Sequence, residues 1–197
     1  MQRIEFSGTS VAANLTGFAT NVTGATWALS ATNSADSLAH KVTIKNNSVT
    51  DHSAKTITLT GTDANGKVLI ETLAAPGTSA TVTSVNYFLT LTGATVSATI
   101  GADTFNIGWA AASASGYYYP KQNGIPTFNI GIGCRVGTGT PTFSIQHTYD
   151  GVGWLDHSVI TGKTASIDGV YTSPVLAIRL AFSVAGQVFA TGYQFGA

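Results

Sequence analysis

Charged residues are scarce in this 197-residue chain, where Asp, Glu, Lys and Arg make up 9% of the sequence. An average globular domain contains roughly 25%. Hydrophobic residues still account for 44%, which excludes a disordered chain, because such chains bury too little apolar surface to fold. A surface with so little charge gives weak repulsion between copies. It is typical of a protein whose surface is largely covered by partners.

A basic patch is lacking too. Nine basic residues balance nine acidic ones, and they are scattered from Arg3 to Arg179 without a run. Proteins that bind nucleic acids neutralise phosphates with clustered Lys and Arg, and segments that lie on membrane surfaces use the same residues. We therefore expect neither a nucleic acid nor a membrane among the partners.

Cysteine is almost absent, since Cys134 stands alone. This excludes an internal disulfide and a cysteine-based zinc site. Cys134 alternates with isoleucines, so we expect it in the core. The N-terminal sequence MQRIEFSGTSVAANLTG has no continuous apolar segment behind a basic start, and no apolar run has the length of a membrane span. The sequence thus predicts a chain that folds in a reducing cytosol.

Helical periodicity is missing from every window, and alternation with period 2 dominates. Residues 40–46 (HKVTIKN) and 55–61 (KTITLTG) separate apolar and polar side chains onto two faces. Asn65-Gly66 then predicts a two-residue type I′ hairpin to a return strand at 67–73. Further strands are expected at 85–91, 94–100, 104–110, 127–134, 142–149, 174–182 and 187–195. Short β-branched and aromatic runs at this spacing predict an all-β fold of β-sandwich or jelly-roll-like modules.

Two modules in tandem, 1–110 and 117–197, are predicted from a composition shift at 110–116 (AAASASG), which is typical of a linker or long loop. The first begins with a Ser/Thr-rich arm, residues 1–39. For residues 7–39 an extended arm and irregular edge strands both remain open. The second module is short for a sandwich, and small domains bury a smaller fraction of their surface. We therefore expect oligomerisation to support it.

The best candidate for a chemical site is the group His147, Asp150, Asp156 and His157. Two histidines and two carboxylates can bind a divalent metal or perform acid–base chemistry. Alternation, however, places Asp156 and His157 on opposite faces of their strand, and aspartates next to glycines commonly hold turn backbone. This pattern favours a structural hydrogen-bond cluster at a strand end over a metal or catalytic site.

Catalytic motifs are absent. GIGCRVGTG fits neither Gly-x-Gly-x-x-Gly nor a phosphate-binding loop, so its glycines are better explained by a turn or a close backbone approach. No Gly-x-Ser-x-Gly nucleophile elbow occurs. The sequence therefore predicts a protein that is not an enzyme and that needs no cofactor or metal.

Arg179 lies between Ile178 and Leu180 in the most apolar predicted strand. An unpaired charge is costly to bury, so we expect either an ion pair with Asp150 or Asp156, or a place in an interface. The aromatic residues considered for cores, interfaces or sugar stacking are Trp27, Trp109, Trp154, Tyr117, Tyr118 and Tyr119. Their types alone do not select a ligand.

Two segments carry a resemblance. In the first, DHSAKTITLTGTDANGKVLIETL and VTSVNYFLTLTGATVSATIGADTFNIGWA supply a Ser-x-Lys-Thr strand, a Gly-Thr-Asp-x-x-Gly hairpin and a Tyr-Phe strand. In the second, SIQHTYDGVGWLDH and SPVLAIRLAFSVAGQVFATGYQF supply a Gln-x-Thr-x-Asp strand end, a Trp-x-Asp-His strand and a Pro-Val-x-Ala-Ile-Arg-Leu strand. In this order they cover most of residues 40–197 and resemble an uncharacterised family of tailed-bacteriophage virion structural proteins.

The resemblance implies a component of a phage virion that acts by assembly. The leading expectation is a capsid decoration (cement) protein, a homo-oligomer and most simply a homotrimer, that contacts itself and the major capsid protein or another virion protein and stabilises the head. The alternative is a tail, neck or fibre component that carries a carbohydrate-binding module. An exposed, ordered row of aromatic side chains would favour this alternative, whereas aromatics buried at subunit contacts would favour decoration.

Overall fold

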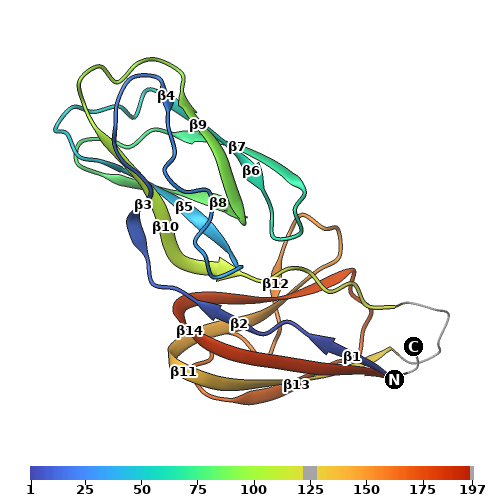
Figure 1. Ribbon diagram of the computed structural model, residues 1–197. Coiled ribbons are helices and arrows are strands. Elements are labelled where there is room, and N and C mark those ends of the chain that lie inside the picture. The colour runs from blue at the N-terminus through green and yellow to red at the C-terminus, as the bar shows by residue number, and fades with distance from the viewer. Residues whose placement is uncertain (122–127, 196–197) are drawn as a thin grey trace. The chain divides into compact units, whose positions relative to one another are not determined.

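The computed structural model describes residues 1–121 and 128–195, and its strands confirm the predicted all-β class. They form a ten-stranded and a four-stranded sheet. The chain divides into unit 1, Met1–Val11 with Ala114–Ala197, and unit 2, Ala12–Ser113 (Figure 1). No helix in the described ranges has the length and apolar character to cross a membrane.

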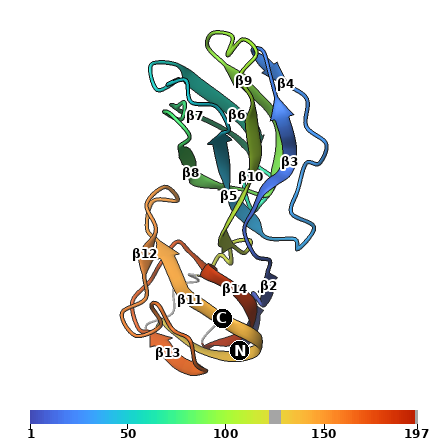
Figure 2. The same cartoon turned by 90° about the vertical axis from the view of Figure 1, so that its left-hand side faces the viewer.

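Unit 2 is a sandwich of two antiparallel layers (Figure 2). One layer contains β3 (Asn14–Val22), β10 (Phe105–Ala114), β5 (Ala39–Asn46) and β8 (Thr81–Phe88), and the other contains β4 (Thr26–Trp27), β9 (Thr90–Val96), β6 (Thr56–Thr62) and β7 (Val68–Ala74). The predicted alternation is confirmed, because Val42 and Ile44 of β5 and Ile57 and Leu59 of β6 are all 0% exposed. Burial of each such side chain stabilises the fold by about 1.5–3 kcal/mol.

The predicted hairpin between β6 and β7 is confirmed, but the predicted type I′ turn is wrong. Asp63 N donates to Lys67 O, and Gly66 N donates to Asp63 O. Gly66 has φ 79°, whereas Asn65 is outside the positive-φ region. This is a three-residue loop, a type I turn closed by a glycine bulge. The Asp63 carboxylate selects it by accepting the Asn65 and Lys67 amides.

A buried carboxylate joins the two layers of unit 2 at β7 and β8, which are the last strands of their respective sheets. Glu71 of β7 accepts hydrogen bonds from the amides of Val85 and Asn86 in β8, at 2.6 and 2.9 Å, and from Asn86 Nδ2. Amides at a sheet edge invite another strand to pair with them. Glu71 satisfies these two from within the unit.

Unit 1 is built around one long antiparallel ribbon. It contains β1 (Gln2–Glu5), β2 (Gly8–Ser10), β11 (Asn129–Thr148), β12 (Leu155–Asp156), β13 (Ile167–Tyr171) and β14 (Ala177–Phe195). The strands predicted at 142–149 and 187–195 are therefore the second halves of β11 and β14, and residue 127 of the strand predicted at 127–134 lies outside the described residues.

The ribbon bends where Gly139 of β11 lies opposite Gly186 of β14 (Figure 1). Gly139 has φ 77° and Gly186 has φ 146°, and a Cβ on Gly186 would lie 2.8 Å from Pro141 Cδ. Both positions therefore require glycine. The bend lets the same two strands contribute to both layers of the unit, which is why a module this short encloses a core.

Two predicted segments differ in the structure. Residues 1–11 belong to unit 1, not to a module 1–110 or an arm 1–39, because β1 and β2 pair with β14 and bury Ile4. Residues 110–114 are not a loop, since β10 continues to Ala114, although the division between the units does fall within the predicted segment 110–116. Small side chains suggested a linker, but Ser113 and Ala114 are fully buried, and composition does not distinguish the two cases.

Candidate functional site

His147 and His157, which the sequence suggested as part of a chemical site, both contact Tyr171 of β13. Tyr171 OH lies 3.2 Å from His147 Nδ1, and the Tyr171 ring centre lies 5.3 Å from that of His147 and 4.6 Å from that of His157, both edge-on. Burial lowers the pKa of His147, and the nearby His157 lowers it further. The arrangement is a polar contact inside the unit.

His157 has no ring nitrogen available for a metal. Nδ1 accepts the amides of Val159 and Ile160, so Nε2 is the protonated nitrogen and donates to Val170 O at 3.2 Å. The side chain holds the loop after β12 against β13.

The two aspartates hold backbone and neighbouring side chains. Asp150 accepts the Val152 and Gly153 amides and the Thr148 hydroxyl, and these bonds, the Val152 amide first, lower its pKa. Asp156 accepts from Gln146 Nε2 and the Thr161 hydroxyl, each at 2.8 Å. Across residues 1–121 and 128–195, no three His, Cys, Asp or Glu side chains form a group suited to a metal ion.

Arg179 is 6% exposed. Its Nε donates to Gln146 Oε1 at 2.9 Å, so Gln146 lies between Arg179 and the carboxylate of Asp156. The guanidinium lies 4.0 Å from the centre of the Trp154 ring, a cation–π contact. Trp154 in turn packs on Tyr117 at 4.8 Å.

The other aromatic residues considered for sugar stacking mostly pack inside their own units. Trp27 is 4% exposed and packs on Phe105, and Trp109 packs edge-on against Phe18 at 5.1 Å. Tyr118 OH donates to Gln194 Oε1. Tyr119 alone of the nominated residues is strongly exposed, at 56%, so these residues form no exposed row.

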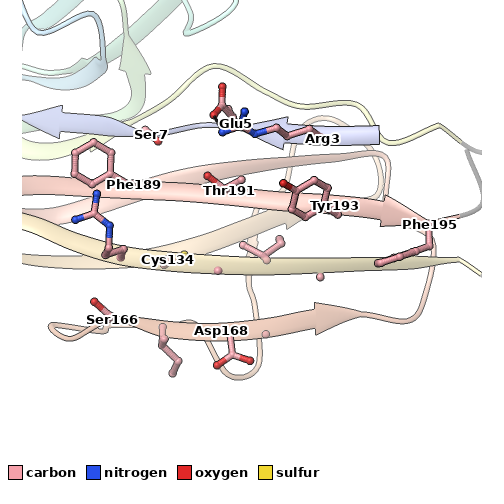
Figure 3. A pocket seen from close by; sticks show the side chains of 16 residues that line it. Arg3, Glu5, Ser7, Cys134, Ser166, Asp168, Phe189, Thr191, Tyr193 and Phe195 are labelled. Carbon is pink, nitrogen blue, oxygen red and sulfur yellow. Dashed lines mark ion pairs between the residues drawn. The ribbon is translucent and has the colours of Figure 1, made fainter. Parts of the chain in front are cut away.

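An aromatic row does occur on the outer face of unit 1, at positions not nominated from the sequence. Phe189, Tyr193 and Phe195 lie on one face of β14, with the two latter residues 42% and 55% exposed (Figure 3). They border a groove of about 930 Å³ that runs over β1, β14, β11 and β13. This groove is a broad hollow on the sheet face, open to solvent, and not an enclosed cavity.

Two glycines form the floor of this groove, which we call the sheet-face groove. Gly131 lies between Tyr193 of β14 and Val170 of β13, and Gly133 lies between Thr191 and Asp168. A Cβ on Gly131 would meet nothing within 4 Å, and one on Gly133 would meet only Thr191 O at 3.9 Å. Neither glycine has a positive φ. Glycine inside a strand costs roughly 0.5–1 kcal/mol, and neither packing nor backbone conformation explains it here.

Charged side chains border the groove in balanced numbers. Arg3 and Glu5 of β1 form an ion pair at 2.5 Å, with side chains 62% and 59% exposed. The Arg135 guanidinium lies 4.3 Å from the Phe189 ring centre, and Asp168 is exposed on β13 (Figure 3). The groove thus combines flat apolar rings, open floor and both signs of charge.

The sequence contained a signal for this groove. In QVFATGYQF the aromatics Phe189, Tyr193 and Phe195 share one face, while Val188 and Ala190 share the other and are 0% exposed. For GIGCRVGTG the prediction is a turn or a close backbone approach; Gly139 lies at the bend of the ribbon, whereas Gly131 and Gly133 lie within the extended part of β11. The sequence alone does not distinguish a glycine in a turn from a glycine under an open groove, because the distinction requires the strand register.

No model of a known protein family matches the chain, and no curated protein sequence matches it.

Proposed function

We propose that the chain is a non-catalytic structural subunit of a tailed-phage particle, assembled in the host cytoplasm. Its leading role is capsid decoration, in which copies associate as a trimer and bind the major capsid protein. The resemblance over residues 40–197 supports this role, as does a surface with few charges, because uncharged faces are cheap to desolvate on assembly.

The observation that carries the proposal is an apolar flank on unit 2. Val68 and Ile70 of β7 are 72% and 62% exposed, and Val85 of β8 is 76% exposed. They lie on the two strands that the Glu71 bridge joins, with Val68 and Ile70 on the outer face of β7, opposite to Glu71. Exposed apolar side chains of this kind can bind a neighbour through side-chain contact.

Sedimentation of the full chain over a range of concentrations tests self-association, and particles with and without the protein test head stability under heat and osmotic shock. A triple variant, Val68→Thr, Ile70→Thr and Val85→Thr, should reduce the mass of the associated species and the occupancy of particles. Val152→Thr, at an 84% exposed site of unit 1, is the matched control. A monomer at every concentration, with particles equally robust without it, would refute decoration.

The second candidate is a tail, neck or fibre component that binds carbohydrate. The exposed aromatic row of the sheet-face groove is the specific observation that favours it, since this is the feature expected of that alternative. A particle subunit can combine both roles, because the apolar flank and the groove belong to different units.

A further inference from the structure

We infer that the sheet-face groove of unit 1 binds a neutral oligosaccharide, with successive sugar rings lying on Phe189, Tyr193 and Phe195 above the Gly131–Gly133 floor. This deepens the second candidate function by assigning the site and the class of ligand. The inference is the same whether the subunit belongs to a head, tail or fibre.

The glycine floor points to a ligand. Two neighbouring strand glycines of unit 1 are required by the fold: a Cβ on Gly192 would lie 2.7 Å from Gly131 O, and one on Gly169 would lie 2.9 Å from His157 Cε1. Gly131 and Gly133 face open space with ordinary extended backbone. Strand glycines of this kind mark close approach of another molecule, and any larger side chain would fill the groove.

The spacing of the rings selects a chain of units over a single small molecule. Phe189 and Phe195 are six residues apart, which is roughly 20 Å along a strand, and Tyr193 and Phe195 are roughly 7 Å apart. One monosaccharide cannot contact all three rings, whereas an extended oligosaccharide can. An aromatic ring offers a flat apolar face of negative potential, which complements the C–H face of a sugar ring.

The polar rim selects a neutral ligand. Arg3 and Arg135 are balanced by Glu5 and Asp168, so the groove has no excess of either sign to attract a polyanion or polycation. Guanidinium and carboxylate groups hydrogen-bond well to hydroxyls, as donors and acceptors respectively. Arg3, Glu5 and Asp168 border the groove, where the hydroxyls at a sugar's edge would project when its C–H face stacks, whereas the Arg135 guanidinium lies over the Phe189 ring.

Other occupants fit less well. A nucleic acid would need uncompensated cations for its phosphates. An extended peptide binds at a sheet edge, where free amides and carbonyls are available, whereas this groove crosses a sheet face. A lipid tail would take water away from four charged side chains, which is costly even for the Arg3–Glu5 ion pair. The experiment below distinguishes sugar binding in the groove from contact with a second copy of the chain.

The test titrates the full chain with linear neutral hexasaccharides of glucose, galactose, mannose and N-acetylglucosamine, and with hexagalacturonate as the charged probe, by calorimetry and NMR. We expect at least one neutral probe to bind and the charged probe to bind more weakly. Tyr193→Ala and Phe195→Ala should each weaken binding by roughly tenfold, as expected of central aromatic contacts.

The decisive variant fills the floor, with Gly131→Val and Gly133→Val together. Valine suits a strand better than glycine, so the melting temperature should stay the same or rise while sugar binding is lost. Gly93→Val is the matched control, because Gly93 of β9 lies outside the groove and its Cβ would meet only Thr60 Cβ at 3.8 Å. It should bind like the wild type.

The inference is overturned if no neutral probe binds at millimolar concentration, if the charged probe binds better, or if the filled-floor variant binds like the wild type. It is also overturned if that variant lowers the sedimenting mass, since the groove would then be a contact between copies. The apolar-flank variant should bind sugar normally, so failure of the decoration role and failure of this inference are distinguishable.

Discussion

The two units satisfy their buried polar groups in different ways. Unit 2 buries charged groups: the Asp36 and His40 side chains are 4% and 1% exposed and 2.7 Å apart, and Glu71 lies between its two layers. Unit 1 buries one charged side chain, Arg179, against Gln146 and the Trp154 ring, and otherwise uses uncharged groups, such as the contact of His147 with Tyr171. A buried charge whose partner is removed costs more than a neutral hydrogen bond, so unit 2 should be the more sensitive to single substitutions.

Each ring nitrogen of His40 lies within hydrogen-bond distance of an oxygen atom. Nδ1 lies 2.8 Å from Ala110 O, and Nε2 lies 2.7 Å from Asp36 Oδ2. Both neighbours are acceptors, and a ring donates to both only when both of its nitrogens carry a proton. Burial alone would raise the pKa of Asp36, but hydrogen bonds from His40, Ser34 and the Leu38 amide outweigh it and lower that pKa.

Unit 1 satisfies most of its buried polar groups with amides, hydroxyls and a neutral imidazole. Gln194 is 1% exposed, accepts from Tyr118 OH and the Lys121 amide, and donates to Lys121 O. Burial raises the pKa of Tyr171, which stays a neutral phenol. These groups tolerate desolvation without a counter-charge, and the outer face of the unit is therefore free to carry the charged rim of the groove.

The largest effect should come from breaking the buried pair. Asp36→Asn keeps the size of the side chain but leaves His40 without a carboxylate, and we expect a loss of about 3–5 kcal/mol in the free energy of unfolding. Urea unfolding gives the total, and hydrogen exchange should locate the loss in unit 2. Asp168→Asn, at an exposed site, is the control and should change little. An unaltered midpoint for Asp36→Asn would show that the pair is not ionic.

A smaller loss, about 1–3 kcal/mol, is expected for Glu71→Gln. The amide keeps one acceptor oxygen, so one of the two β8 amides loses its partner. Exposing an edge amide should also increase association at high concentration, which light scattering would detect. If stability falls without added association, the bridge joins the layers but does not protect the edge.

In unit 1, Tyr171→Phe should cost only about 0.5–1.5 kcal/mol, the scale of one neutral hydrogen bond. The ring remains between His147 and His157, so packing is preserved. The midpoint of urea unfolding measures this, with Tyr119→Phe at an exposed position as the control. A loss as large as that of Asp36→Asn would contradict the distinction between the units.

The sequence predicted what depends on local alternation. The faces of β5, β6 and the two halves of β11 followed from period 2, because burial of one face dominates a strand's stability. What it missed depends on pairing between distant residues. The strand β1 joins unit 1 through β14, nearly two hundred residues away, and the bend of the ribbon needs Gly139 opposite Gly186.

The candidate site was predictable only in part for the same reason. His147 and His157 are near in sequence and do lie together, on Tyr171, whereas Asp150 and Asp156 bind turn amides and neighbouring side chains. No spacing rule supplies Tyr171 or the loop amides as partners. The sheet-face groove draws on β1, β11, β13 and β14 at once. Its aromatic row was visible in the sequence of β14, whereas its empty floor became visible only when β11 was placed beside it.

The smallest effect, and the one that most sharpens the comparison, is the order in which the units respond to acid. The pKa of His147 lies below its ordinary 6.5, mainly through burial and then through His157, with Asp156 opposing the shift more weakly. Above pH 6.5 the ring is neutral in both folded and unfolded chains, and as the pH falls below 6.5 the unfolded chain takes up a proton first, so unit 1 loses stability. For Asp36 the ordinary pKa is 3.8 and the pKa in the folded chain is lower, so its contribution to the stability of unit 2 is complete above pH 3.8 and is lost only below it.

Hydrogen exchange, corrected for intrinsic rates, should therefore show β11 and β14 losing protection before β5 and β6 as the pH falls. His147→Gln should remove the early loss in unit 1 and leave unit 2 unchanged. Earlier weakening of unit 2 would mean that its charged pair, and not the neutral histidine contact, is the acid-sensitive part of the molecule.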